Sequence, residues 1–481
     1  MPSKYLKNYI LSVTNTIIGL IIPIITFPYI SRILGPDKIG VVNFVQSYAY
    51  YFMHIASFGI MSYAVREIAR VRDNREEVER LGNEIFNLNL FFSLISGFLY
   101  IGIVLIVPKF RENFILYLLY SSTIFTNFLL LDWLFQAYDD YAFTTIRTIA
   151  IRVILIVCIF ILIKQENDYV IYMIIITLAD MGNRFSSLFY ARKNFIRFRL
   201  SPKFLNFAKH FKSLFTLFSY RIVNGISSNL DKLMLGIFIA YTDVGIYSTG
   251  VKFVLLVVPM IETVGVVLFP KITIAAKDNT ELYLENLKLN YKIILLLGIP
   301  MAVGMFLVSP ELMMLFAGKQ FTGSIIVSRI MSAIIILCPI GDLLGSKTLL
   351  VYNKDKWLLI CSIIVATCNI VFNFIGIPLF GIVGACVASV LCYLIAVIAR
   401  YIFTRKIIKF RLFNAELFLY SLYTVPFVIL YIVFKSYINK SVMLLFVYIL
   451  ACVVIYFLEL LVFKDKTTKQ ILSAFMKRKK N

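Results

Sequence analysis

The sequence predicts an all-α integral membrane protein: about fourteen transmembrane helices, grouped as two parallel-repeat six-helix lobes around a central cavity, with two further C-terminal helices. Three observations support this fold. The 481 residues are 60% hydrophobic and only 15% charged, whereas soluble globular proteins carry about 25% charged residues. Apolar runs long enough for a helix to cross a hydrocarbon core of about 30 Å recur along the whole chain. Lysine and arginine gather between these runs, and the two halves of the chain share a sequence repeat.

The apolar runs place the predicted helices in order along the chain. They cover residues 9–33, 41–63, 84–107, 114–137, 142–163, 169–190, 214–240, 244–270, 289–309, 324–350, 357–379, 381–404, 416–435 and 441–463. The longest polar connections, at 64–83 and 191–213, are too short for a folded domain. The sequence therefore predicts essentially no soluble domain.

The basic residues determine the predicted orientation. Of the 48 lysines and arginines, 33 fall in the two terminal segments and in alternate connections, and 8 fall in the other connections. Because cytoplasmic loops are enriched in these residues, both termini are predicted to be cytoplasmic. The same distribution accounts for the net charge of +22 without a nucleic-acid partner.

A shift of 205 residues aligns the two halves. Gly40 then matches Gly245, and the Arg-Asp-Asn triplet at 72–74 matches the Lys-Asp-Asn triplet at 277–279. The shift spans six helices and keeps their orientation, so the repeat is parallel. It predicts an N-terminal lobe at 1–213, a C-terminal lobe at 214–411, and helices 13 and 14 with a basic cytoplasmic tail at 412–481.

Polar residues follow one face of the first two helices of each half. The stripe on helix 1 includes Asn15, and the stripe on helix 7 includes Arg221, Asn224 and Lys232, with Asp231 at its edge. Polar side chains are costly against lipid, so such stripes face a bundle interior or a watery cavity. Any single stripe also fits an ordinary helix–helix contact, but four matching helices favour a central cavity between the halves.

Three cations indicate what kind of substrate the predicted cavity would bind. Arg221, Lys232 and Lys252 lie well inside predicted spans, where an ionisable residue indicates function. A positive cavity suits an anionic group such as a diphosphate, which arginine binds through a fork of N–H donors and lysine binds as a point charge. The alternatives are that Asp231 pairs with one of these cations, or that their long side chains reach an interface.

Four residues are candidates for coupling transport to H⁺ or Na⁺. Asp132 and Glu262 have no basic partner in their own helices, Asp231 flanks Lys232, and His54 titrates near physiological pH. The seven cysteines lie in apolar runs without metal-ligand spacing, and there are only two histidines, so no metal site and no other cofactor is predicted. Without a Walker motif, a catalytic triad or paired carboxylates on a polar loop, the chain is predicted not to be an enzyme.

Three segments carry a resemblance to a known family. They are FPYISRILG at 27–35 followed by Gly40, DWLFQA at 132–137 with Arg147 and Arg152 downstream, and NLDK at 229–232 leading to GIYS at 245–248. Through these segments the chain resembles, over nearly its whole length, the polysaccharide (oligosaccharide–lipid) flippases of the multidrug/oligosaccharidyl-lipid/polysaccharide exporter superfamily.

The resemblance implies a function. It implies movement of an undecaprenyl-diphosphate-linked oligosaccharide to the outer leaflet of a bacterial plasma membrane, for capsule, O-antigen or exopolysaccharide assembly, with ion-gradient coupling. It implies Arg221, Lys232, Lys252 and Arg32 as basic cavity residues, and membrane lipids, a polysaccharide polymerase and export machinery as partners. The alternatives are a peptidoglycan lipid-precursor flippase, a multidrug/cation antiporter, which would favour an acidic cavity, and a non-transporting membrane scaffold.

Overall fold

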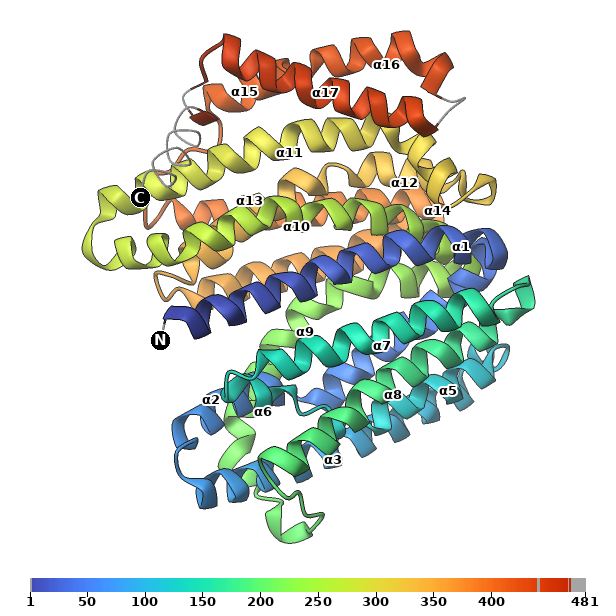
Figure 1. The fold of residues 1–481 in the computed structure, drawn as a ribbon, viewed down its shortest axis with the longest axis vertical. Helices are drawn as coiled ribbons and strands as arrows, with labels where there is room; N and C mark the ends of the chain where they lie inside the picture. The colour runs from blue at the N-terminus through green and yellow to red at the C-terminus, as the bar shows by residue number, and fades with distance from the viewer. Residues whose placement is uncertain (1, 439–441, 466, 469–481) are drawn as a thin grey trace. The chain divides into compact units, whose positions relative to one another are not determined.

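A computed structural model describes residues 2–438, 442–465 and 467–468 (Figure 1). These residues form helices joined by short turns, and no strand occurs among them. Within the described ranges, nine helices are long and apolar enough to cross a membrane. The predicted all-α membrane class is therefore confirmed, while the number fourteen stays a prediction.

The chain forms two compact units, residues 1–245 and 246–481. The predicted lobe boundaries at 213 and 411 stay predictions. The first unit contains α1 (Pro2–Ser57), α2 (Ile60–Val71), α3 (Arg75–Ile106), α4 (Pro108–Arg111), α5 (Phe114–Phe125), η1 (Asn127–Leu129), α6 (Asp132–Ala137), α7 (Tyr141–Leu162), η2 (Glu166–Asp168), α8 (Tyr169–Asn194), η3 (Pro202–Phe204) and α9 (Phe207–Phe238).

The second unit begins inside α10 (Tyr241–Asp278). It continues with α11 (Thr280–Phe316), η4 (Lys319–Phe321), α12 (Ser324–Met331), α13 (Ile334–Leu344), the π-helical turn η5 (Gly345–Leu349), α14 (Asp355–Thr404), α15 (Ala415–Leu422), α16 (Val425–Ile438) and α17 (Val442–Val462).

Two of the longest helices each contain two arms that meet at a glycine. Gly35 in α1 has a φ of 67°, and Gly381 in α14 has a φ of 58°. Residues with side chains rarely adopt these left-handed angles, so glycine permits the turn. The arms of α1 correspond to the predicted helices at 9–33 and 41–63, and the arms of α14 to those at 357–379 and 381–404.

Two predicted segments have wrong bounds, and a third, at 114–137, is interrupted. The helix predicted to reach residue 63 ends at Ser57, because Phe58 and Gly59 have positive φ angles of 37° and 75°. Most of the connection predicted at 64–83 is helical, since it contains the end of α2 and the start of α3. The helix predicted at 114–137 is interrupted between α5 and α6, where the Leu131 backbone N–H donates instead to Ser187 Oγ at 3.0 Å.

The repeat is visible in equivalent helix caps. The side-chain oxygen of Asn74 accepts hydrogen bonds from the backbone N–H groups two and three residues later, and Asn279 does the same. These caps satisfy N–H groups that the first turn of a helix leaves unpaired. Because α3 and α11 begin 205 residues apart with the same cap, the structure supports the predicted repeat.

The repeat also produces a reciprocal close contact inside the first unit. A Cβ atom at Gly40 would lie 1.7 Å from the carbonyl oxygen of Tyr241, and a Cβ at Gly245 would lie 1.9 Å from that of Pro36. Pro36 and Tyr241 are themselves 205 residues apart. In each half a glycine therefore packs against the equivalent carbonyl of the other half, as in a two-fold interface. Both glycines are needed for the two backbones to approach this closely.

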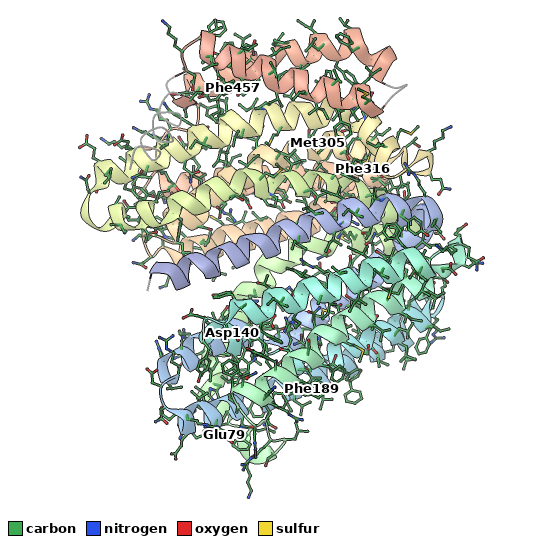
Figure 2. All side chains as sticks on the ribbon, in the orientation of Figure 1. Glu79, Asp140, Phe189, Met305, Phe316 and Phe457 are labelled. Carbon is green, nitrogen blue, oxygen red and sulfur yellow. The ribbon has the colours of Figure 1, made fainter. Side chains whose placement is uncertain are left out.

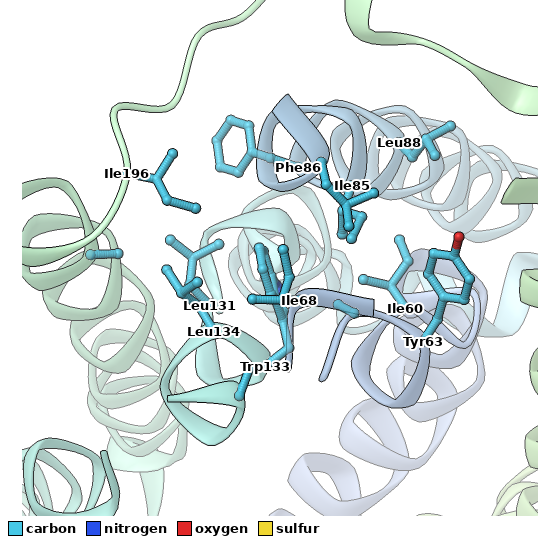
Figure 3. Close-up of a cluster of buried hydrophobic side chains, with 14 of the residues drawn as sticks. Ile60, Tyr63, Ile68, Ile85, Phe86, Leu88, Leu131, Trp133, Leu134 and Ile196 are labelled. Atoms are coloured by element: carbon cyan, nitrogen blue, oxygen red, sulfur yellow. The ribbon is translucent and has the colours of Figure 1, made fainter. Parts of the chain in front are cut away.

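A buried apolar cluster holds one end of the first unit together (Figure 3). Ile68 of α2, Phe86 of α3 and Trp133 of α6 meet in it, with Ile196 from the segment that precedes α9. Trp133 is 1% exposed. Because fully burying such side chains stabilises a fold by about 1.5–3 kcal/mol each, this cluster fixes α2 and the segment before α9 against α3.

A hydrogen-bonded chain lies at the edge of this cluster. The Tyr63 hydroxyl is 2.6 Å from His210 Nδ1, and His210 Nε2 is 2.8 Å from the Glu84 carboxylate, which also accepts a hydrogen bond from Lys209. Burial lowers the pKa of His210, so the ring is neutral at pH 7. Its Nε2–H then donates to Glu84, and Nδ1 accepts from Tyr63, which ties α9 to α2 and α3.

Apolar side chains also cover much of the exposed surface. Phe189 on α8 is 67% exposed and Phe457 on α17 is 46% exposed, and Figure 2 shows where both lie on the ribbon. Monomeric soluble proteins rarely expose large contiguous apolar patches. Long apolar helices with exposed aromatic and aliphatic side chains fit a surface that faces lipid.

The reciprocal glycine contact yields a stability prediction. Gly40→Ala and Gly245→Ala each place a methyl group against a backbone carbonyl that cannot move without its helix, and overpacking of this kind costs about 1–3 kcal/mol. We expect each variant to lower Tm in detergent. Gly102→Ala and Gly304→Ala are matched controls, because a Cβ at either position meets nothing within 4 Å. Equal Tm values for all four variants would contradict the close contact.

Candidate substrate-binding site

The polar faces of α1 and α9 meet inside the first unit. Gly225 on α9 is the point of approach: a Cβ there would lie 3.4 Å from both His54 Nε2 and the Tyr50 hydroxyl of α1. Tyr50 and His54 are in edge-to-face contact, with ring centroids 4.4 Å apart. Among the described residues, His54 Nε2 has no hydrogen-bond partner. A polar nitrogen of α1 thus faces the stripe of α9 that carries Arg221 and Lys232.

Arg221 lies one turn before Gly225. Its Nη2 donates to Ser62 Oγ at 2.9 Å, and its charge acts on His54. In the described part of the chain, no carboxylate lies within ion-pair distance of this guanidinium. A guanidinium has five N–H donors, so most of its capacity is left for another acceptor.

Lys232 lies further along α9. Its Nζ donates to Asn229 Oδ1 at 2.9 Å, and the described residues place no carboxylate oxygen within 4 Å of it. Asp231 beside it is 6% exposed and interacts electrostatically with Lys232 and with Tyr51 of α1. The alternative that Asp231 pairs with one of the three cations stays a prediction, and the Lys232 ammonium donates to a neutral amide.

The other predicted binding residues are Arg32, Lys252, Asn15 and Asn224. Arg32 is exposed on the first arm of α1, close to the turn at Gly35. Lys252 is half-buried on α10 and belongs to the second unit. Asn15 lies in α1 and Asn224 lies in α9, but their side chains are outside the described set. Their predicted roles, and the cavity shared by both halves, stay predictions.

Asp132, an ion-coupling candidate, has a partner that sequence reasoning did not assign to it. Arg147 of α7 places Nη2 at 2.9 Å and 3.1 Å from its two carboxylate oxygens. The Arg147 side chain is 5% exposed and also lies over the Phe143 ring. Because Asp132 opens α6, directly after the interruption of the helix, the ion pair fixes α6 against α7. Its predicted coupling role stays a prediction.

Glu262, the remaining coupling candidate, lies on α10 in the second unit. The Cys338 thiol donates to Glu262 Oε1 at 3.7 Å, and Asp342 and Lys347 act on it electrostatically. The Lys347 side chain is 5% exposed and pairs with Asp342. Lys347 lies in the π-helical turn at 345–349, near the end of the helix predicted at 324–350.

The buried ion pair of the first unit can be tested by substitution. Asp132→Asn leaves the Arg147 charge buried without a counter-charge, which costs about 3–5 kcal/mol, whereas removing both charges is far less costly. We expect Asp132→Asn to lower Tm strongly and Asp132→Asn/Arg147→Gln to recover part of the loss. Arg70→Gln, which breaks an exposed pair with Glu67, is the control. An Asp132→Asn effect no larger than that control would contradict the role of the pair.

Comparison with known proteins shows the family of this chain. The chain matches the family model described as "Polysaccharide biosynthesis protein" over residues 5–275. It is 20% identical over 336 residues to a putative O-antigen transporter of Escherichia coli, covering 70% of this chain and 81% of that protein. It is 28% identical over 210 residues to a probable low-salt glycan biosynthesis flippase of Haloferax volcanii, covering 42% of this chain and 44% of that protein.

Solved structures show the same fold. The lipid II flippase MurJ in an inward closed conformation superposes with a TM-score of 0.76 at 17% identity, covering 96% of this chain and 99% of that one. An inward-facing multidrug transporter of the MATE family superposes with a TM-score of 0.62 at 13% identity, covering 80% and 94%. Because the family model spans more than half of the chain, the protein belongs to the polysaccharide biosynthesis protein family, as a flippase-like multi-pass membrane transporter and not an enzyme.

Proposed function

We propose that the protein moves an undecaprenyl-diphosphate-linked oligosaccharide from the cytoplasmic to the outer leaflet of a bacterial plasma membrane, for assembly of a surface polysaccharide. The observation that carries the proposal is the pair of cations on α9. Arg221 donates to Ser62 of α2 and Lys232 to Asn229 of α9, and neither forms an ion pair among the described residues. Ionisable residues within the membrane mark functional sites, and these two cations suit an anionic head group.

The chemistry of the head group fits the two residues. A diphosphate offers several anionic oxygens, which arginine contacts through its fork of donors and lysine through a mobile ammonium. Eleven residues of helix separate Arg221 from Lys232, or about 16 Å along the axis. This is about half of a 30 Å hydrocarbon core. We infer that the diphosphate contacts the two cations in succession as it crosses.

Several further parts of the proposal follow the family and the charge distribution. Both termini lie in the cytoplasm, and a gradient of H⁺ or Na⁺ supplies the energy, with His54, Asp231, Asp132 and Glu262 as the candidate coupling residues. The charge of Arg221 acts on His54, so protonation of His54 would add positive charge where the head group binds. A polysaccharide polymerase and export machinery receive the lipid-linked product.

The proposal predicts that neutralising the two cations blocks export without unfolding the protein. Arg221→Gln and Lys232→Met each remove a charge-assisted contact worth about 1.5–3 kcal/mol, so we expect about a tenfold or greater loss of surface glycan. The undecaprenyl-diphosphate oligosaccharide should accumulate in the cells. Surface glycan and extracted lipid are measured in a deletion strain that carries each variant.

Arg329→Gln and Lys435→Met are the matched controls. Arg329 donates to the backbone carbonyl of Phe306 and Lys435 is exposed on α16, so both should leave export unchanged. Normal export by Arg221→Gln and Lys232→Met at wild-type protein levels would contradict the proposed site. A deletion strain with normal surface glycan and impaired peptidoglycan synthesis would instead indicate the peptidoglycan lipid precursor as the substrate.

A further inference from the structure

Lys347 occupies an unusual place in the second unit. It lies in the π-helical turn η5, directly after α13, and the Tyr283 hydroxyl donates to its backbone carbonyl at 3.0 Å. Its Nζ lies 2.5 Å from the Asp342 carboxylate. A buried ammonium is costly unless it is paired and hydrogen-bonded, and π-helical turns frequently occur at functional sites. The groups around the Lys347 ammonium therefore determine whether it is stable in this buried position.

Two other helices converge on the same ammonium. A Cβ atom at Gly265 of α10 would lie 2.5 Å from Lys347 Nζ and 3.3 Å from the amide of Asn290 on α11. Glycine at position 265 is thus what leaves space for the ammonium. Asn290 is fully buried, and neither its Oδ1 nor its Nδ2 has a partner among the described residues. An amide oxygen turned toward Nζ is attractive, whereas an amide N–H is not.

A second carboxylate completes the surroundings. Glu262 lies one turn before Gly265 on α10, and its charge acts with those of Asp342 and Lys347. Among the described residues no cation lies within 4 Å of Glu262, and its hydrogen-bond donor there is the Cys338 thiol. Arg400 of α14 lies against α13 and donates to the Gly341 carbonyl at 2.8 Å. The two negative charges of Glu262 and Asp342 are therefore matched by the two positive charges of Lys347 and Arg400.

We propose that the Lys347 ammonium is a built-in cation, which fills an oxygen-lined site formed by Asp342, Glu262 and Asn290 that would otherwise take a monovalent metal ion such as Na⁺. Carboxylate and amide oxygens are the ligands that hard cations prefer. Removing the Lys347 charge leaves two carboxylates against the single charge of Arg400, and this net negative charge attracts a free cation. The second unit of the native protein thus needs no Na⁺ at this site, whichever lipid the protein carries.

The test measures the thermal unfolding of the full-length protein in detergent, in sodium chloride and in choline chloride at equal ionic strength. We expect the wild type to have the same Tm in both salts. Lys347→Met should gain a saturable, Na⁺-specific rise in Tm of about 2–4 °C, and the rise should disappear in Lys347→Met/Asp342→Asn. Lys347→Gln keeps a polar side chain of similar length without the charge, and it should show the same response if Lys347→Met does not fold.

Lys292→Met is the matched control, because it removes a lysine that pairs with Glu416 in the same unit and should create no Na⁺ response. Two results would overturn the proposal. One is a Na⁺-specific rise in the Tm of the wild type that Asp342→Asn removes, because the site would then already bind the metal ion. The other is a folded Lys347→Met or Lys347→Gln variant whose Tm is the same in both salts.

Discussion

A charge or a free backbone hydrogen-bonding group inside an apolar helix must be paired or hydrated, and much of this structure follows from that cost. The interruption before α6 is possible because Ser187 accepts the Leu131 N–H, and Arg147 is buried because Asp132 pairs with it. Among the described residues, neutral oxygens hold Arg221 and Lys232. The proposed function assigns the missing counter-charge to the substrate.

The two halves of the repeat pair their polar groups in equivalent ways. Asp37 and Thr242, which are 205 residues apart, hydrogen-bond to each other beside the reciprocal glycine contact, and equivalent asparagines start α3 and α11. The fourth predicted helix of each half, at 114–137 and 324–350, is interrupted and carries an aspartate paired with a cation: Asp132 with Arg147, and Asp342 with Lys347. In the described part of each half, a buried cation therefore pairs with an aspartate of this interrupted helix.

The sequence predicted those features that depend on local pattern. Apolar length predicted the helices, and the 205-residue shift matched Asn74 with Asn279, which the structure shows as equivalent helix caps. The roles of Arg221 and Lys232, which were singled out as charges within apolar runs, stay predictions. It missed features that depend on tertiary partners. The break near Leu131 requires Ser187 from another helix. Lys347 lies near the end of the helix predicted at 324–350, but its ion pair with Asp342 depends on the π-helical turn.

The most direct test of the central claim is transbilayer movement by the purified protein. Proteoliposomes that contain the full-length chain receive an undecaprenyl-diphosphate-linked oligosaccharide in one leaflet, and a glycosidase or lectin outside reports how fast the sugar becomes accessible. The account predicts much faster exposure than in protein-free liposomes, and competition by a soluble diphosphate that engages the cations of α9. Exposure at the protein-free rate by folded protein, with or without an ion gradient, would contradict the account.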